Sequence, residues 1–299
     1  MFSFLPATVK GSLSFILYVI NTVFWCIPLF AVAIVKFLIP VPVFRRLCNR
    51  VLIHISFAWI RCNNINQDLF NRLTIVTDGL EGLTQNDWYL VISNHQTWVD
   101  ILVLQRVFYR RIPFLKFFLK KELIWVPVLG LAWWALDFPF MKRYTSEFIK
   151  KNPHLKGKDI EITRKACRKF SEMPVSVMNF LEGTRFTDHK HKSQQSPYNR
   201  LLRPKAGGIA FVLAAMGEHL NSIVNVTIAY PPGPKSFWDF LCGRVTCVRV
   251  HVETIPITEE LIGDYFEDEA FRDRFQEWVN VLWEDKDRRV AELDRNLSL

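Results

Sequence analysis

The chain has 299 residues, half of them hydrophobic, which is enough for one large domain or two small ones with a sizeable core. Its formal net charge is +9, and residues 106–169 hold 16 lysines and arginines against 5 acidic residues. This basic, aromatic-rich middle suits anionic lipid head groups or phosphorylated ligands, and nucleic acid is not expected as a partner because no recognition-helix, zinc-finger or RNA-binding signature is present.

The N-terminal segment has the composition of a membrane anchor. Residues 12–35 carry no charge and, as a helix, are long enough to cross a bilayer. A cleaved signal peptide is disfavoured because no small-residue cleavage pattern follows, whereas Pro28 leaves a kinked or re-entrant helical hairpin open beside a simple span. Lys36 and three arginines follow, so the positive-inside rule places the rest of the chain in the cytoplasm. We expect an anchor at 1–62 and the main domain, which carries any functional site, at 63–299.

Two apolar strands are predicted next, at 74–77 and 88–92, and the turn after the second carries the first reactive groups. Thr97 with Asp100 has the form of a capping box that starts a helix at about Thr97, so His95 lies in the strand-to-helix turn. Such a turn can bring a carboxylate onto one ring nitrogen and leave the other nitrogen free to take a proton. Alternatively, His95 only hydrogen-bonds the turn and Asp100 only caps the helix.

Residues 123–141 form a second apolar segment with Asp137 as its one charge. Two prolines and a glycine interrupt this segment, which argues against a second span. Its clustered tryptophans favour a position at the lipid interface or the lining of an apolar tunnel, and packing in an ordinary core is the alternative. The tryptophans are Trp125, Trp133 and Trp134.

A polar loop at 152–159 and a basic helix at 161–170 lead to another apolar strand at 175–181. That strand ends in Glu182-Gly183-Thr184-Arg185. Since ligands of open α/β sheets bind where the chain leaves the strands, Arg185 and nearby lysines are candidate anion binders beside the histidine.

Residues 186–200 are polar and include His189 and His191, an H-x-H pair that invites a metal. No third ligand lies nearby, so a solvated loop or mobile lid is favoured. The six cysteines form no CxxC pair and no Cys/His cluster of zinc spacing, so they are expected to be reduced thiols.

The remaining elements complete an alternating pattern of strands and helices. Residues 205–208 precede an apolar helix at 209–216, strands are predicted at 223–230 and 245–252, and 259–295 form a charged amphipathic tail with a docking face. The pattern predicts an α/β fold: a central mixed sheet flanked by helices, preceded by a membrane-anchoring helix or helical hairpin.

The reactive groups favour one kind of chemistry. No serine or cysteine sits in a GxSxG elbow, and nothing has the form of a P-loop. A base beside an anion binder suits a reaction in which the substrate's own hydroxyl attacks, while the protein removes its proton and holds a phosphate.

Several motifs occur together in a recognisable order. Residues 94–100 have the form NHxxxxD, 140–143 are an aromatic-rich segment ending in arginine, and 182–185 are EGTR. A lysine-rich run before a leucine, at 120–123, lies between the first two. These motifs resemble those of the glycerolipid acyltransferase family, which includes the bacterial PlsC-type 1-acylglycerol-3-phosphate acyltransferases. The family's fourth motif usually contains proline; residues 223–227 lack it and are similar to the YihG-like and lysocardiolipin acyltransferase-like branch.

The resemblance implies transfer of an acyl chain from acyl-CoA or acyl carrier protein to the free glycerol hydroxyl of a lysophospholipid, with 1-acylglycerol-3-phosphate as the expected acceptor and phosphatidic acid as product. By that resemblance His95 is the base and Asp100 orients it. It implies no metal or other cofactor, and it gives membrane lipids, the lysophospholipid and the acyl donor as partners. It also implies a bacterial inner membrane location.

The resemblance further gives a set of substrate-binding residues: Lys120, Arg143, Glu182, Gly183, Thr184 and Arg185. Of these, Arg185 and Lys120, with Arg143, would hold the acceptor's phosphate, since arginine can grip a phosphate with two parallel hydrogen bonds. Glu182 would contact the acceptor's glycerol or organise the loop.

Three other interpretations compete. The acceptor could be a lysophospholipid with another head group. The chain could be a non-catalytic membrane-surface protein that binds anionic lipids. Finally, the same histidine and carboxylate could activate water, as in a thioesterase or phospholipase.

Overall fold

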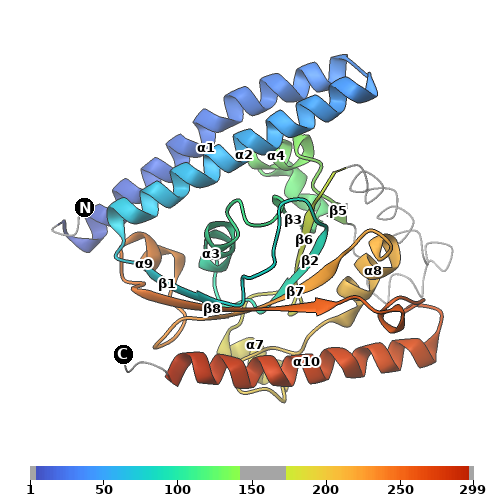
Figure 1. Cartoon of the computed structure of the whole chain (residues 1–299). Coiled ribbons are helices and arrows are strands. Elements are labelled where there is room, and N and C mark those ends of the chain that lie inside the picture. The colour runs from blue at the N-terminus through green and yellow to red at the C-terminus, as the bar shows by residue number, and fades with distance from the viewer. Residues whose placement is uncertain (1–4, 142–172, 296–299) are drawn as a thin grey trace.

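The computed structural model describes residues 5–141 and 173–295, and a six-stranded sheet forms its centre (Figure 1). The strand order is β1-β8-β7-β2-β6-β3. The strands are β1 (Thr74–Asp78), β2 (Tyr89–Ser93), β3 (Leu115–Phe117), β6 (Ser176–Phe180), β7 (Ser222–Ala229) and β8 (Cys247–Pro256). The four strands β7, β2, β6 and β3 are mutually parallel, whereas β8 is antiparallel to β7 and parallel to β1. The mixed α/β sheet expected from the sequence is therefore confirmed.

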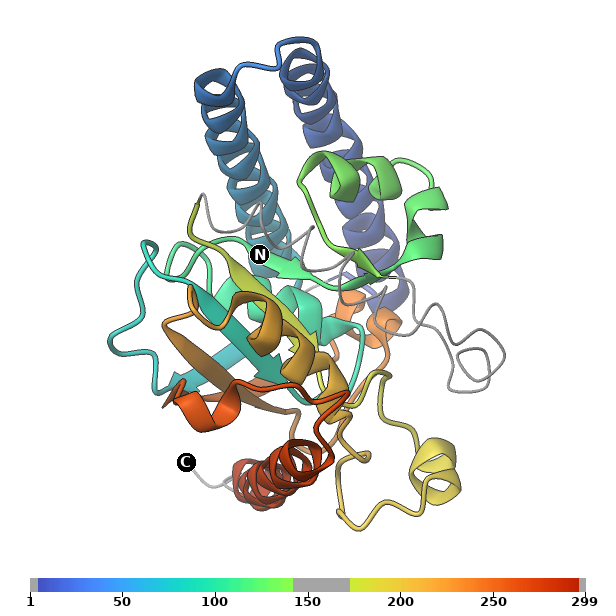
Figure 2. The ribbon, with the colours of Figure 1, turned by 90° about the vertical axis from the view of Figure 1, so that its right-hand side faces the viewer.

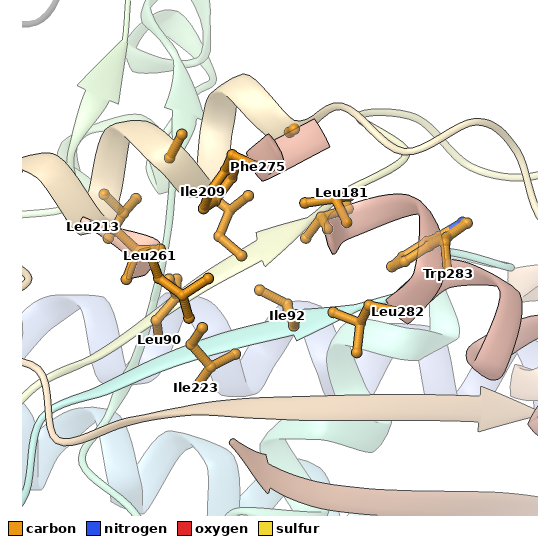
Figure 3. Packing of buried hydrophobic residues seen from close by; sticks show 14 of the residues in the cluster. Leu90, Ile92, Leu181, Ile209, Leu213, Ile223, Leu261, Phe275, Leu282 and Trp283 are labelled. Carbon is orange, nitrogen blue, oxygen red and sulfur yellow. The ribbon is translucent and has the colours of Figure 1, made fainter. Parts of the chain in front are cut away.

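Helices cover both faces of this sheet, which explains why its central strands are apolar on both sides. On one face, α3 (Val99–Val107) and α9 (Phe237–Leu241) pack on alternate strand residues such as Val91. On the other, α8 (Ala206–Met216) and α10 (Glu269–Arg295) pack on residues such as Leu90. Figure 3 shows this second core, in which side chains from β2 and β7 meet those of α8 and α10.

The amphipathic tail predicted at 259–295 contains a short 3-10 helix, η4 (Glu259–Leu261), and α10. The expected docking face exists, because Phe271, Phe275 and Leu282 of α10 are buried against the sheet and α8. Trp278 is partly buried beside them.

The N-terminal part is a helical hairpin in which α1 (Ala7–Leu38) and α2 (Pro42–Phe70) lie side by side (Figures 1 and 2). Among the described residues, α1 is the one helix long and apolar enough to cross a membrane, and Pro28 lies within it without ending it. Most of its apolar surface is exposed, as at Ile27, which is 67% exposed. The boundary placed after residue 62 falls inside α2, which continues as one helix into the sheet domain.

The apolar segment 123–141 folds as short pieces beside this hairpin. It runs from η1 (Lys121–Trp125), which follows β4 (Leu119–Lys120), through α4 (Leu129–Ala135) to β5 (Phe140–Met141). Buried alanines of α4 pack on α1, and Lys36 of α1 lies 2.6 Å from Asp137. The loop and helix predicted at 152–159 and 161–170 lie outside the described residues.

Candidate active site

The turn between β2 and α3 brings His95 and Asp100 together. The Nδ1 atom of His95 lies 2.8 Å from Oδ2 of Asp100, and both residues are buried. Because Asp100 stands in the first turn of α3 while His95 precedes that helix, the bent backbone closes a five-residue gap that a continuous helix would keep open. The spacing argument from the sequence therefore holds for the geometry of this pair.

Asp100 is held by donors on both of its oxygens. The backbone N–H groups of Gln96 and Thr97 donate to Oδ2 at 2.7 and 3.0 Å, and the hydroxyl of Tyr230 donates to Oδ1 at 2.6 Å. These bonds pin the carboxylate, so Asp100 organises the turn and also holds the imidazole. The two interpretations of Asp100 as cap or as partner of His95 are thus not exclusive.

Only one of the two hydrogen bonds of the predicted capping box forms. The carboxylate of Asp100 does accept from the Thr97 N–H, but the Thr97 hydroxyl donates to the carbonyl of Lys235 at 2.8 Å and caps nothing. The helix begins at Val99, and Trp98 before it already has helical backbone angles, so the start lies close to the expected position at about Thr97.

Asn94, the first residue of the NHxxxxD motif, extends the sheet beyond the end of β2. Its side-chain amide donates to the carbonyl of Ile228, and its side-chain oxygen accepts from the Ile228 N–H, both at 2.9 Å. These two hydrogen bonds imitate the backbone pairing of neighbouring strands, so Asn94 continues the contact between β2 and β7 next to His95.

The ends of β2 and β6 meet at the imidazole. Ser93 pairs with Phe180 in the parallel register, and the Phe180 ring stacks on His95 with centroids 3.9 Å apart and planes 11° apart. The N–H of Phe186 donates to the carbonyl of His95 at 2.7 Å. The EGTR turn thus lies against the histidine, as expected from two neighbouring strand ends.

Within EGTR, Arg185 and its neighbours make a cationic surface. The guanidinium of Arg185 lies 4.2 Å from the centre of the Trp98 ring, a cation–π contact. Lys190 donates to the Thr184 hydroxyl at 2.7 Å and to the Arg185 carbonyl at 3.1 Å. Lys190 therefore orders the turn and adds a second positive charge to it.

Gly183 stands at the tip of this turn with φ of 65°, where residues with a side chain are strained. A Cβ atom built there would lie 3.3 Å from the Lys205 side chain, so the exposed lysine crosses close above the turn. The sequence predicted that lysines near Arg185 would help to bind an anion, without saying which ones. In the structure, Lys205 and Lys190 lie at this turn.

Glu182, the first residue of EGTR, is fully buried. Burial, and secondarily the charge of Asp100, raise the pKa of its carboxyl well above the usual value. Oε1 accepts from the N–H of Leu202 at 3.4 Å, which ties EGTR to the segment before α8. Of its two expected roles, this burial favours organising the loop.

An apolar cavity of about 370 Å³ opens beside the imidazole. Both His95 and Phe180 line it, together with side chains from α1, α2, α3 and residues 114–138. Trp133 faces this cavity, whereas Trp125 and Trp134 are 85% and 53% exposed. The segment 123–141 thus lines an apolar cavity on one side and presents tryptophans outward on the other.

Two predicted substrate-binding residues cannot be placed. Arg143 lies outside the described residues, as does the side chain of Lys120, whose backbone ends β4.

The H-x-H pair lies in a short helix, α7 (Asp188–Ser193), where the Nε2 atom of His191 lies 2.6 Å from the carbonyl oxygen of Tyr198. Across residues 5–141 and 173–295, no three His, Cys, Asp or Glu side chains are arranged to hold a metal ion.

Sequence reasoning missed Tyr230 and Phe180 as partners of the histidine–aspartate pair. Both were visible as aromatic residues at or near the ends of predicted strands, at 223–230 and 175–181. These positions indicated that both residues lie at the carboxyl ends of the strands, where His95 also lies. The contacts themselves depend on strand order, which no local pattern shows.

Comparison with known proteins agrees with this geometry. Residues 74–230 match the protein-family model described as Acyltransferase. The chain is 24% identical over 200 residues to 1-acyl-sn-glycerol-3-phosphate acyltransferase 2 of Brassica oleracea, a match that covers 60% of this chain and 48% of that protein. It is 25% identical over 244 residues to the 2-acyl-1-lysophosphatidylinositol acyltransferase of Saccharomyces cerevisiae, a match that covers 66% of this chain and 59% of that protein.

The first of these relatives is matched over only about half of its length. A further relative, the human 1-acyl-sn-glycerol-3-phosphate acyltransferase gamma, is 25% identical over 184 residues, covering 56% of this chain and 43% of that protein. Among solved structures, the fold is similar to that of PlsC, the 1-acyl-sn-glycerophosphate acyltransferase of Thermotoga maritima, with a TM-score of 0.53 and 17% identity. That likeness covers 98% of this chain and all of the other.

Proposed function

Because the chain belongs to the Acyltransferase family, we propose that it transfers an acyl chain from a thioester to the free glycerol hydroxyl of a lysophospholipid. The expected acceptor is 1-acylglycerol-3-phosphate, with phosphatidic acid as product, and the donor is acyl-CoA or acyl carrier protein. The single observation that carries this proposal is the His95–Asp100 pair at the wall of an apolar cavity.

The chemistry follows from that pair. The Nε2 atom of His95 takes the proton of the acceptor hydroxyl as its oxygen attacks the thioester carbonyl carbon. The new C–O ester bond forms, the C–S bond breaks, and the proton passes from the imidazolium to the departing thiolate. Asp100 stabilises the transient imidazolium through Nδ1, and no protein nucleophile or other cofactor is needed.

The cavity provides room for an acyl chain. Its lining is largely apolar, and its volume of about 370 Å³ lies in the range of ligand pockets. Since it is shared by the hairpin and the sheet domain, an acyl chain bound there would have its reactive end at His95 and its tail between α1 and α4.

The cations around EGTR provide a site for the acceptor's phosphate. Arg185 is held over Trp98, and Lys190 and Lys205 stand beside the same turn. A guanidinium flanked by ammonium groups favours a phosphomonoester, which carries close to two negative charges near neutral pH.

The exposed apolar surface of the hairpin supports a location at a membrane. We propose that α1 and α2 insert their exposed apolar surface into the bilayer, with the sheet domain on the cytoplasmic side, in a bacterial inner membrane. Lysophospholipids reside in that membrane, so the acceptor would reach the site by lateral diffusion.

An acceptor-dependence assay tests the proposal. Purified protein in mixed micelles is given oleoyl-CoA or oleoyl-acyl carrier protein, and free thiol is measured with and without 1-oleoylglycerol 3-phosphate. Thiol release that needs the lysolipid, with one phosphatidic acid formed per thiol, is expected. Release without acceptor would indicate a thioesterase, and no release with either donor would indicate a lipid-binding protein.

A panel of acceptors with the same donor then tests the head group. It contains lysophosphatidic acid, lysophosphatidylinositol, lysophosphatidylglycerol and lysocardiolipin. The phosphomonoester should give the highest kcat/KM, because the three cations at EGTR match its charge. A preference for a larger head group would move the chain to the remodelling branch without changing the chemistry.

A further inference from the structure

We propose that Tyr230 is a positioning residue, which holds Asp100, and through it His95, in the geometry that proton transfer requires. This inference rests on the proposed function, because it assigns a role within the same site. Along the sequence, Tyr230 lies far after the NHxxxxD motif, and no motif of the sequence marks it.

The first step of the argument is the contact itself. The hydroxyl of Tyr230 donates to Oδ1 of Asp100 at 2.6 Å, while Oδ2 receives His95 and two backbone N–H groups. Asp100 is fully buried and Tyr230 is 3% exposed, so water cannot replace this donor. Without it, Oδ1 would be a buried acceptor with no donor, and the carboxylate could rotate away from the imidazole.

The second step is how the fold delivers the tyrosine. Asn94 binds both backbone groups of Ile228, which fixes the end of β7 against the end of β2. Residues two apart on a strand point to the same face, so Tyr230 follows Ile228 into the core that also contains α3. The same motif therefore supplies His95, Asp100 and, through Asn94, the position of the third side chain.

The third step is the protonation state of the hydroxyl. Burial, followed by the neighbouring charge of Asp100, raises the pKa of Tyr230 well above its usual value. The phenol consequently stays protonated at every pH where the enzyme would work, and it acts as a permanent donor toward the carboxylate.

The test is Tyr230→Phe, which removes one oxygen and keeps the ring. We expect kcat to fall about tenfold, with the KM values for oleoyl-CoA and 1-oleoylglycerol 3-phosphate changed by less than about twofold. A wild-type kcat, or a loss seen only in KM, would overturn the proposal.

A matched control separates this effect from general destabilisation. Tyr89 is also 3% exposed, and at the opposite end of β2 its hydroxyl donates to Asp87 at 3.1 Å. Tyr89→Phe should lower the thermal midpoint by a similar amount to Tyr230→Phe while leaving kcat unchanged. Equal losses of kcat in both variants would mean that Tyr230 only stabilises the fold.

A double-mutant cycle connects Tyr230 to its target. In an Asp100→Asn background, Tyr230→Phe should cost less than about threefold, because the anionic acceptor is gone. Losses that multiply would contradict action through Asp100. His95→Ala shows whether the proposed function or only the role of Tyr230 fails. Full activity of His95→Ala would reject the proposed base. An inactive His95→Ala together with a fully active Tyr230→Phe would reject only the role of Tyr230.

Discussion

The ring of Phe180, the last residue of β6, lies parallel to the imidazole of His95 with a centroid separation of 3.9 Å. Because His95 follows the neighbouring strand β2, this stack joins two strand ends and fixes the plane of the imidazole from one side. Asp100 fixes it within that plane through Nδ1. Two perpendicular constraints therefore orient the ring that we propose as the base.

The first prediction concerns His95 and Asp100. His95→Ala should reduce acceptor-dependent thiol release below detection while membrane binding is retained, since the hairpin is untouched. Asp100→Asn should lower kcat by about 10² to 10⁴, because the amide cannot stabilise an imidazolium or hold its tautomer. Circular dichroism and flotation with liposomes check folding and binding. An unfolded Asp100→Asn protein would instead support a purely structural role for this side chain.

The second prediction concerns the cationic surface at EGTR. Arg185→Ala should raise the KM for 1-oleoylglycerol 3-phosphate more than tenfold, and Trp98→Ala about three- to tenfold, because the indole holds the guanidinium in place. The KM for the acyl donor should change little in either variant. Arg203→Ala is the control, since the guanidinium of this exposed arginine donates to the backbone carbonyls of Gln194 and Gln195. Equal effects in all three variants would argue for a diffuse electrostatic attraction.

The third prediction concerns the length of the acyl chain. Ala132 of α4 is buried and lines the cavity, so Ala132→Phe should fill part of it and shift preference from oleoyl-CoA toward decanoyl-CoA. The ratio of the two kcat/KM values is the measurement. Ala214→Phe, on the exposed face of α8, should leave that ratio unchanged. A constant ratio in Ala132→Phe would place the acyl chain elsewhere.

The fourth prediction concerns Lys286 of α10, which is 2% exposed and donates to the carbonyl of Val226. Burial lowers the pKa of its ammonium from 10.5 to about 7. Between pH 7 and 10.5 this lysine is protonated in the unfolded chain but not in the folded chain. Its contribution to the free energy of unfolding therefore rises with pH over that range and is lowest below pH 7.

Lys286→Met removes this titration. Relative to that variant, wild-type protein should gain about 2 kcal/mol of unfolding free energy between pH 7 and pH 9. Urea unfolding at several pH values measures the difference. Parallel curves for the two proteins would show that the ammonium is not destabilised in the fold.

The sequence alone predicted five of the six strands of the central sheet, β1, β2, β6, β7 and β8, and the residues of the candidate site. Runs such as 88–92 and 175–181 are apolar because their strands are covered on both faces, and the NHxxxxD and EGTR motifs at the ends of these runs mark the candidate reactive side chains. Local sequence also sufficed for the His95–Asp100 pair, because the two residues are only five positions apart in one turn.

Contacts between distant segments were decided only by the tertiary structure. The Thr97 hydroxyl donates to the backbone carbonyl of Lys235, so the predicted capping box is incomplete. Tyr230 reaches Asp100 because β7 lies beside β2, an order that depends on the packing of whole strands. Strand order and cavity shape result from many weak contacts summed over the domain, and a local pattern of residues does not contain that sum.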